Sequence, residues 1–230
     1  MGAILVFDTE TISLEKKFIY NLGYVIADAD GKIICERDFV IRQIYDNKPL
    51  FATSYYVVKR PLYTRRLQGR KCQKVSWGEA CRIMCKDIQT HGVTDGYAYN
   101  SPFDISAFYF NHLFFRNKRR PLDGIKVHDI MKEIEGLVNT EEYRNYCRVH
   151  GFMTRNGRTR QTAEVVYGYI TQNPNYIEEH TALADSRIEL AILRAATRAT
   201  EIGKVAKVAT ESAALEKALG RLDGIVVDNK

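Results

Sequence analysis

Long hydrophobic runs are missing from this 230-residue sequence, since no segment approaches the roughly 18 consecutive apolar residues that a membrane helix needs. The N-terminus has no basic region and turns acidic at Asp8, which argues against a signal peptide. Val6 stands where a myristoylation pattern needs serine or threonine. We therefore expect a protein without membrane segments and with a cytoplasmic location.

The five cysteines are too few and too irregularly spaced for a cysteine-based framework. Their number is odd and no pair has the CxxC spacing of zinc ligands, which argues against both a disulfide framework and a structural zinc site. Reduced thiols are the simplest interpretation, and they agree with a cytoplasmic location.

The sequence does contain enough apolar material for a core, with 45% hydrophobic residues. We expect one domain over residues 1–202, followed over residues 203–230 by a helical tail rich in alanine, lysine and glutamate. The formal net charge is +6 and the isoelectric point lies near 9.0, so the chain is basic. A basic surface suits a polyanionic partner.

Three strand patterns open the chain. The apolar run at residues 3–7 predicts a buried strand that ends at Asp8. Residues 18–27 and 33–41 predict two more strands, joined by a turn whose Asp30-Gly31 step is a hairpin signal. We expect an antiparallel three-stranded unit, and we expect the chain to turn after Phe7 so that Asp8 and Glu10 reach one site.

Helical spacing of apolar residues appears after Ser76. Ser76 and Glu79 form a capping-box pattern before an expected helix at residues 77–90. The other expected elements are strands at 97–99 and 124–128 and helices at 105–115, 130–138, 162–170 and 181–202. The first of these helices would place Ile105, Phe108 and His112 on one face. Residues 155–158 predict either a solvent-exposed hairpin or a mobile basic loop.

Four acidic residues and one histidine stand where these elements begin or end: Asp8, Glu10, Asp104, His180 and Asp185. Carboxylate oxygens suit hard cations such as Mg²⁺ or Mn²⁺. Two such ions about 4 Å apart stabilise both the attacking and the leaving oxygen in phosphodiester cleavage. The set therefore indicates a divalent-metal hydrolase site.

Each of these signals also has an ordinary explanation. A D-x-E pattern is expected by chance about once in such a chain, and H-x-x-x-x-D about once in three or four such chains. A lone acid at a helix start is more often an N-cap, and a lone histidine is more often structural. The order, spacing and apolar settings of the residues must therefore carry the inference.

The segments FDTET (residues 7–11), YNSPFD (99–104) and HTALAD (180–185) resemble, in this order, the three motifs of the DEDDh family of 3′-to-5′ exonucleases. That family includes proofreading exonucleases, ribonuclease T and oligoribonuclease. The resemblance covers roughly residues 3–195. It implies an α/β fold with a ribonuclease H-like mixed sheet flanked by helices, so that residues 1–202 would be the exonuclease domain and 203–230 a C-terminal helical extension.

The resemblance also implies roles for individual residues. The ligands of two Mg²⁺ or Mn²⁺ ions would be four carboxylates, those of Asp8, Glu10, Asp104 and Asp185. His180 would be the general base that activates the attacking water, because Thr181 stands where the sister subclass has tyrosine. The residues around the 3′-terminal nucleotide would be Thr9, Thr11, Asn100 and Phe103.

Some of these implied roles depend on the surroundings of the residue. Many family members continue with Thr-Thr-Gly, whereas this chain has Thr11-Ile12-Ser13, so the terminal pocket can differ in shape. Phe103 stands beside a helix start, where an aromatic ring is more often core than stacking platform. A free imidazole titrates near pH 6.5, and we expect the nearby carboxylates to raise the pKa of His180.

Three basic clusters could contact phosphates or could simply be solvated faces. They comprise Arg65, Arg66, Arg70 and Lys71; Arg116, Lys118, Arg119 and Arg120; and Arg155, Arg158 and Arg160. Three tyrosines could supply stacking surfaces for bases: Tyr55, Tyr56 and Tyr63. We expect at least one cluster to contact nucleic acid.

The resulting expectation is a metal-dependent 3′-to-5′ exonuclease that releases 5′-mononucleotides from the 3′ ends of single-stranded DNA. RNA is the second substrate, because no residue clearly recognises or rejects a 2′-hydroxyl. A catalytically silent nucleic-acid-binding protein on the same fold is the alternative, and the complete acid set with His180 counts against it. The oligomeric state stays open, since the tail could pair with a second copy or cover an edge.

Overall fold

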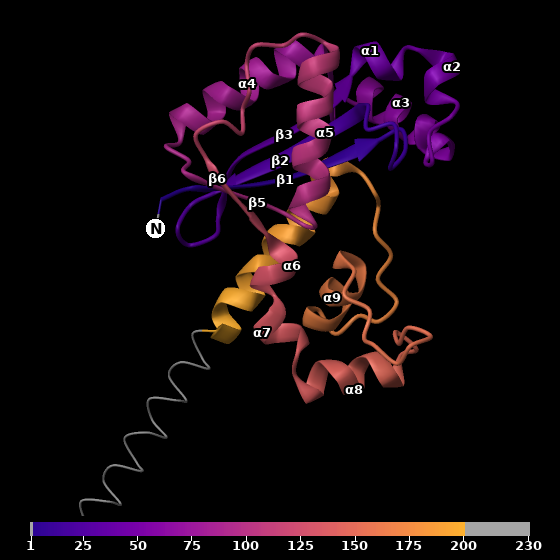
Figure 1. Cartoon of the computed structure of the whole chain (residues 1–230), viewed down its shortest axis with the longest axis vertical. Coiled ribbons are helices and arrows are strands. Elements are labelled where there is room, and N and C mark those ends of the chain that lie inside the picture. The colour runs from indigo at the N-terminus through magenta and orange to yellow at the C-terminus, as the bar shows by residue number, and fades with distance from the viewer. Residues whose placement is uncertain (1, 201–230) are drawn as a thin grey trace, which may run out of the picture.

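The computed structural model describes residues 2–200, which form a six-stranded mixed sheet with strand order β4-β3-β2-β1-β5-β6 (Figure 1). Its strands are β1 (Ile4–Thr11), β2 (Ile19–Ala27), β3 (Ile33–Ile41), β4 (Gln73–Val75), β5 (Asp95–Ala98) and β6 (Lys126–Asp129). Strands β1, β2 and β3 are antiparallel neighbours, as expected. Strand β5 is parallel to both β1 and β6, and β4 is parallel to β3.

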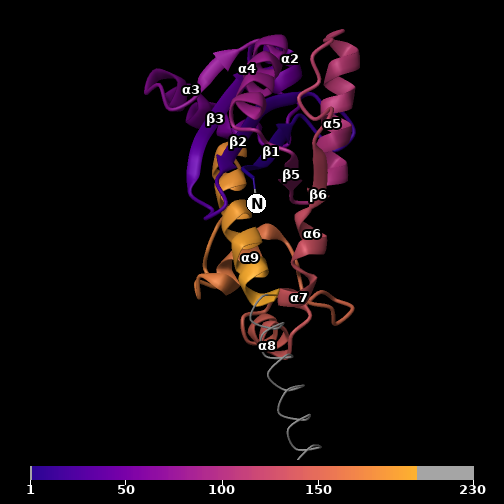
Figure 2. The ribbon, with the colours of Figure 1, turned by 90° about the vertical axis from the view of Figure 1, so that its left-hand side faces the viewer.

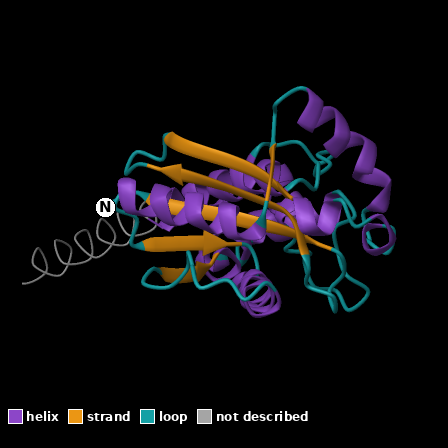
Figure 3. Cartoon of the chain, turned by 90° about the horizontal axis from the view of Figure 1, so that it is seen from above, coloured by secondary structure: helices purple, strands orange, loops and turns teal. Residues whose placement is uncertain are grey.

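Successive residues of β1 point to opposite faces of the sheet, and each face has its own apolar core. Leu5 and Phe7 belong to one core and Val6 to the other. Every residue of β2 is buried, as in a central strand covered on both sides. Figure 3 shows the strands as one layer with helices lying across it. Because side chains alternate along the strand, those of β1 lie in two separate cores, one on each face of the sheet.

The helices of the first half contribute to the core that contains Leu5 and Phe7. They are α1 (Arg42–Tyr45), α2 (Lys48–Phe51), α3 (Arg60–Gln68), α4 (Trp77–Thr90) and α5 (Ser101–Phe114). The 3₁₀ turn η1 (Val57–Lys59), between α2 and α3, has no buried residue. Helix α4 begins as the capping box predicts, because the side chain of Ser76 accepts from the backbone N–H of Glu79. Its buried residues include Trp77, which packs edge-on against Phe108 of α5.

The helices of the second half pack around the core that contains Val6. They are α6 (Ile130–Glu133), α7 (Glu135–Val138), α8 (Glu141–Val149), α9 (Ala163–Ile170) and a final helix over residues 182–200. Figures 1 and 2 show the final helix running from the sheet toward α7 and α8. The first turns of this helix therefore lie against the strands, and its later turns support the smaller helices.

The expected turn after Phe7 is wrong. Strand β1 continues to Thr11, and it pairs with β2 along its whole length. No turn is needed, because residues two apart on a strand point to the same face. Asp8 and Glu10 therefore follow Val6 on the face that the final helix covers.

Several other boundaries differ from the sequence expectations. Helix α5 begins at Ser101 rather than at residue 105, so Asp104 lies in its first turn. Ile105 is 41% exposed and does not share the buried face of Phe108 and His112. The expected helix at 130–138 is two short helices that meet at Ile134. The sequence patterns did not predict α1, α2, α3, α8 and β4, because these elements are short or polar.

The segment around residue 155 is a hairpin, in agreement with the first of the two expectations. Met153 and Thr159 form an antiparallel bridge, and Gly157 has the positive φ of 72° that such a turn favours. The turn at Asp28 to Gly31 is also present, closed by the bond from the N–H of Gly31 to the carbonyl of Asp28. Among residues 2–200, no helix has the length and apolar character needed to cross a membrane. The expected tail at 203–230 lies outside the described residues.

One glycine permits the close contact between the final helix and the sheet. A β-carbon at Gly23 would lie 2.1 Å from the backbone carbon of Ala182 and 2.1 Å from the backbone nitrogen of Leu183. Two polar side chains fix the contact on either side of Gly23. The N–H of Ala182 donates to Oδ1 of buried Asn21 at 2.9 Å, and Oγ of Ser186 donates to the carbonyl of Gly23 at 3.1 Å.

Substitution of Gly23 should separate the helix from the sheet. We predict that Gly23→Ala lowers the free energy of unfolding by about 3 kcal/mol, as overpacking against rigid backbone does. Chemical denaturation measures this change. The matched control is Gly136→Ala in α7, where an added β-carbon would meet no atom within 4 Å, and it should be neutral or mildly stabilising. Equal stability of the two variants would contradict the close contact.

Candidate active site

Strand β1 and the final helix bring three of the predicted acids together. Asp8 pairs with Gly23 of β2, so it stands beside the point where the final helix meets the sheet. Glu10 is one pleat further along β1 and is 8% exposed. Asp185 lies in the first turn of the helix and is 6% exposed. Ligand atoms of Glu10, His180 and Asp185 all lie within 4.8 Å of one another.

The fourth acid, Asp104, lies on helix α5, which packs on the core that contains Leu5 and Phe7. Asn100 adopts a left-handed conformation (φ 57°, ψ 49°) at the start of α5, and Asp104 follows one turn later. Asp104 is 2% exposed, and its Oδ1 accepts a hydrogen bond of 2.6 Å from Oγ1 of Thr9. Thr9 therefore positions Asp104 next to Asp8, and its hydroxyl is already engaged within the protein.

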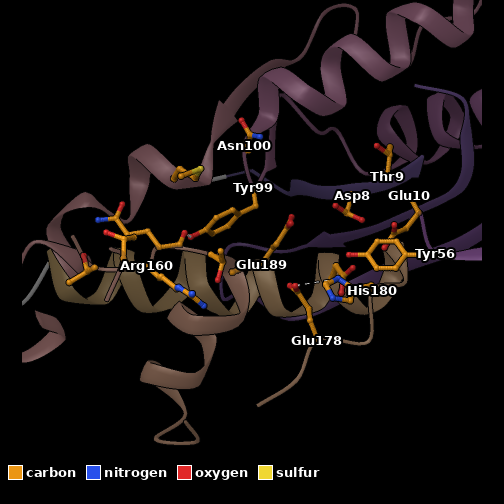
Figure 4. A pocket seen from close by; sticks show the side chains of 17 residues that line it. Asp8, Thr9, Glu10, Tyr56, Tyr99, Asn100, Arg160, Glu178, His180 and Glu189 are labelled. Atoms are coloured by element: carbon orange, nitrogen blue, oxygen red, sulfur yellow. Dashed lines mark hydrogen bonds and ion pairs between the residues drawn. The ribbon is translucent and has the colours of Figure 1, made fainter. Parts of the chain in front are cut away.

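His180 is held by three neighbours in front of the final helix. Its ring stacks on Tyr56 with centroids 4.9 Å apart, and its Nδ1 lies 3.5 Å from Oε2 of Glu178. Its backbone has a positive φ of 50°. The ammonium of Lys59 donates to the carbonyls of Glu179 and His180 and lies 4.6 Å from the centroid of Tyr56. Figure 4 shows Tyr56, Glu178 and His180 together beside Glu10.

The expectation that carboxylates raise the pKa of His180 is wrong. Burial is the largest influence and lowers the pKa below its ordinary value of 6.5, and the positive charge of Lys59 lowers it further. Glu164 opposes them with a smaller effect. The imidazole is therefore neutral at neutral pH, as a general base has to be.

The carboxylates repel one another in a nearly dry environment. Burial, followed by the charges of neighbouring acids, raises the pKa of Asp8 well above its ordinary range. Burial also raises the pKa of Glu10 to about 8 and that of Asp185 to about 9. For Asp104 burial is again the main cause, and the hydrogen bond from Thr9 opposes it, so its pKa is about 7. A cation is the natural partner of such a group.

The donor set fits a hard divalent cation. Oδ1 of Asp185 is buried without a hydrogen-bond partner in the described part of the chain, and so is one oxygen of a further acid, Oε2 of Glu189. Unpaired buried carboxylate oxygens are costly unless a cation binds them. Because the donors are carboxylate oxygens without thiolates, they suit Mg²⁺ or Mn²⁺ rather than softer metals.

A cavity of about 590 Å³ opens over these acids. Figure 4 shows Asp8, Glu10 and His180 at one end, and Tyr99 and Arg160 at the other. The wall near Arg160 comes from the far strand of the 153–159 hairpin and the residues after it, Thr159 to Ala163. Its size lies within the range of small-molecule sites, roughly 300 to 1,000 Å³.

The residues predicted around the terminal nucleotide fall into two groups. Thr9 and Asn100 line the cavity. Thr11 is buried and donates to the carbonyl of Ser13 at 3.2 Å, and Phe103 is half-buried with the ammonium of Lys17 at 5.3 Å from its ring centroid. Thr11 and Phe103 are thus outside the lining formed by the described residues.

The structure also shows which residues of the basic clusters, and which tyrosines, are buried or paired and which border the cavity. Arg66 is committed to ion pairs with Asp38 at 2.6 Å and Glu179 at 2.8 Å. Tyr63 cannot stack on a base, because it is completely buried and donates to Oδ1 of Asn21. Arg160 lines the cavity, whereas Arg155 and Arg158 are exposed on the hairpin.

Two acids of the cavity, Glu189 and Glu178, were not among the residues predicted from the sequence. Glu189 is 3% exposed and lies four residues after Asp185, on the same face of the final helix. That spacing was a signal that could have found it. Glu178 borders His180, and burial raises its pKa to about 7. Glu178 precedes the helix in an irregular segment, so no periodicity pointed to it.

Comparison with solved structures decides the fold. No family model and no curated protein matches the sequence. The structure superposes on Escherichia coli exonuclease I in complex with a dA16 oligonucleotide, with a TM-score of 0.53 and 15% sequence identity. It also superposes on exonuclease I from Methylocaldum szegediense, with a TM-score of 0.52 and 15% identity. The chain has the exonuclease I fold.

This likeness confirms the ribonuclease H-like fold that the three motifs imply. The match to the E. coli structure covers 84% of this chain and 40% of that chain. For the M. szegediense structure the shares are 84% and 39%. The chain therefore spans well under half the length of the exonuclease I chains that it resembles.

The acid cluster should make the stability of the metal-free protein depend on pH. A carboxyl whose pKa is raised by folding stabilises the fold at low pH and loses this contribution as pH rises through the folded value. For Asp185 the window runs from the ordinary 3.8 to about 9. We predict that the melting temperature in EDTA falls between about pH 5 and about pH 8, and that Mg²⁺ or Mn²⁺ restores it.

Two variants separate this effect from general surface charge. Asp185→Asn should flatten the pH dependence, because the amide does not ionise. Glu135→Gln, at an exposed position on α7, should leave the slope unchanged. A melting temperature that rises with pH in EDTA, or that ignores the metal, would contradict the arrangement.

Proposed function

We propose that this chain is a metal-dependent 3′-to-5′ exonuclease that releases 5′-mononucleotides from the 3′ ends of single-stranded DNA. The observation that supports it best is the approach of Glu10, His180 and Asp185 within 4.8 Å of one another, beside Asp8 in an open cavity. Carboxylates for two cations and a base for water are the components that phosphodiester hydrolysis needs.

Asp8, Glu10, Asp104 and Asp185 would hold two Mg²⁺ or Mn²⁺ ions. When bound, the ions neutralise the acid cluster and stabilise charge on the attacking and leaving oxygens. Thr9 keeps the carboxylate of Asp104 in place through its 2.6 Å hydrogen bond. The buried surroundings strengthen these interactions by excluding water.

His180 takes the proton of the attacking water. Its Nδ1 faces Glu178, and the stacked Tyr56 fixes the ring plane, which leaves Nε2 for the water. As the proton passes to His180, the water oxygen bonds to phosphorus and the bond from phosphorus to the 3′-oxygen of the preceding nucleotide breaks. That oxygen gains a proton from solvent. The products are a 5′-mononucleotide and a strand one nucleotide shorter.

Single-stranded DNA is the first choice of substrate. Solved structures of E. coli exonuclease I with this fold hold dA16 and 5cy-dT13 oligonucleotides. In this chain the cavity is bordered by Arg160 and by Tyr56, groups that contact phosphates and bases in single-strand binding. The direct test is release of mononucleotides from matched DNA and RNA oligomers in the presence of Mg²⁺, with Asp104→Asn as the inactive control. Internal cuts or no release would reject the proposal.

Removal of the imidazole should lower kcat and leave substrate affinity nearly intact. We predict that His180→Ala lowers kcat by about 10²- to 10⁴-fold, as loss of a general base does. In the wild type, kcat should rise with pH below the ordinary histidine value of 6.5, because burial and Lys59 lower the pKa of His180. The mutant should lack this limb. Identical pH profiles of kcat would leave His180 with a structural role.

The 153–159 hairpin is the best candidate for contact with the rest of the strand. Arg66 is used in internal ion pairs, and the cluster at 116–120 follows the C-terminal end of α5, about 20 Å along the helix from Asp104. Arg155, Arg158 and Arg160 instead belong to the segment that borders the cavity.

Replacement of Arg155, Arg158 and Arg160 by alanine should weaken the binding of long single strands and spare dinucleotides. The slope of log Kd against log salt concentration should fall by about 2, the value for three lost phosphate contacts on a single strand. The triple replacement of Arg116, Arg119 and Arg120 by alanine is the control and should keep the wild-type slope. The reverse pattern would assign the strand to the end of α5.

A further inference from the structure

Glu189 is a buried acid that the four predicted ligands do not account for. It is 3% exposed, and its Oε2 has no hydrogen-bond partner among the described residues. It lies one turn after Asp185 on the final helix, so both carboxylates leave the same helix face.

The surroundings of Glu189 are acidic. It lines the cavity together with Asp8, and Figure 4 shows its carboxylate directed toward Asp8 in the space between Asp8 and Tyr99. The charged groups that most affect its own pKa are Asp104, Asp185 and Glu178, all of them carboxylates. The backbone N–H of Tyr99 is the one group that lowers the pKa of Glu189, and it leaves Oε2 without a partner. A buried carboxylate with an unpaired oxygen among other acids is unfavourable unless it takes up a proton or a cation.

Glu189 does not belong to the group of close ligand atoms formed by Glu10, His180 and Asp185. The atoms of Glu10, His180 and Asp185 cluster at the end of the cavity where Tyr56 lies. Among the charged neighbours of Asp8, Glu189 raises its pKa the most, followed by Asp104. Glu189 thus adds a donor on the side of Asp8 that faces Tyr99, opposite to the side on which Glu10 lies (Figure 4).

We propose that Glu189 is a fifth carboxylate ligand, which holds the second divalent cation against Asp8 in the absence of nucleic acid. This inference rests on the proposed two-ion site and adds to it a property of the substrate-free protein. Hard cations take several oxygen ligands, so one more carboxylate makes the site beside Asp8 less dependent on oxygens from a substrate phosphate. The enzyme would meet its substrate with both ions in place.

The test is Mn²⁺ binding to the full chain without nucleic acid, measured by isothermal titration and by electron paramagnetic resonance. The wild type should bind two ions and give the spectrum of a coupled pair. Glu189→Gln preserves the shape of the side chain and removes the charge. It should weaken one of the two ions by about 10-fold or more and remove the coupled signal. Without metal, its melting temperature should equal or exceed that of the wild type.

Two further variants make the result specific. Glu135→Gln removes an exposed carboxylate on α7, outside the lining of the cavity, so it should keep both ions. Glu189→Asp keeps the charge but withdraws it by one methylene, so it should also weaken the second ion. It replaces the glutamine variant if that protein does not fold.

The outcomes distinguish the inference from the function on which it rests. Two ions of wild-type affinity in Glu189→Gln would overturn the inference and identify Glu189 as a protonated acid. Equal losses in Glu189→Gln and Glu135→Gln, or a wild type that binds one ion or none, would also overturn it. A wild type that binds two ions through Glu189 but releases no nucleotides would keep the inference and reject the exonuclease.

Discussion

The contact between Gly23 and the first turn of the final helix is the constraint on which the site depends. Helix backbone occupies the place where any other residue would carry its β-carbon, at 2.1 Å. Gly23 is also the partner of Asp8 in the β1–β2 register, so the helix meets the sheet beside the first acid. Asn21 and Ser186 fix the helix in this position. Asp185, between the two fixed residues of the helix, is thereby held over β1.

The segment between β3 and β4 completes the site from outside. It supplies Tyr56, which stacks on the imidazole, and Lys59, which binds the carbonyls of the left-handed turn at His180. The same ammonium charge lowers the pKa of His180 and lies at the border of an otherwise acidic region. One lysine therefore supports both the position and the neutral state of His180.

The sequence predicted the elements that carry a strong period or cap, namely β1 to β3, α4 and the final helix. It also placed the acids at the starts or ends of expected elements, with Asp104 directly before the helix expected at 105–115. It did not predict the environment of Tyr63 or the pKa of His180, because both depend on contacts across the fold. Lys59 is 121 residues from His180 in the sequence, and Tyr63 is 42 residues from Asn21. The error at Phe7 was different, since the alternation of β1 already places Asp8 and Glu10 on one face.

Burial of the carboxylates at the candidate site lowers the stability of the folded protein. The pKa values of Asp8, Glu10 and Asp185 are all raised chiefly by desolvation, so each acid is less favourable there than in water. Two completely covered apolar cores and an entirely buried central strand offset this cost. A site strained by its own charge gains most from a cation, because binding removes repulsion as well as adding ligand bonds. The same repulsion that weakens the metal-free protein is therefore the physical basis of the cation binding that we propose for the cavity, and through the cation of the proposed binding of phosphate.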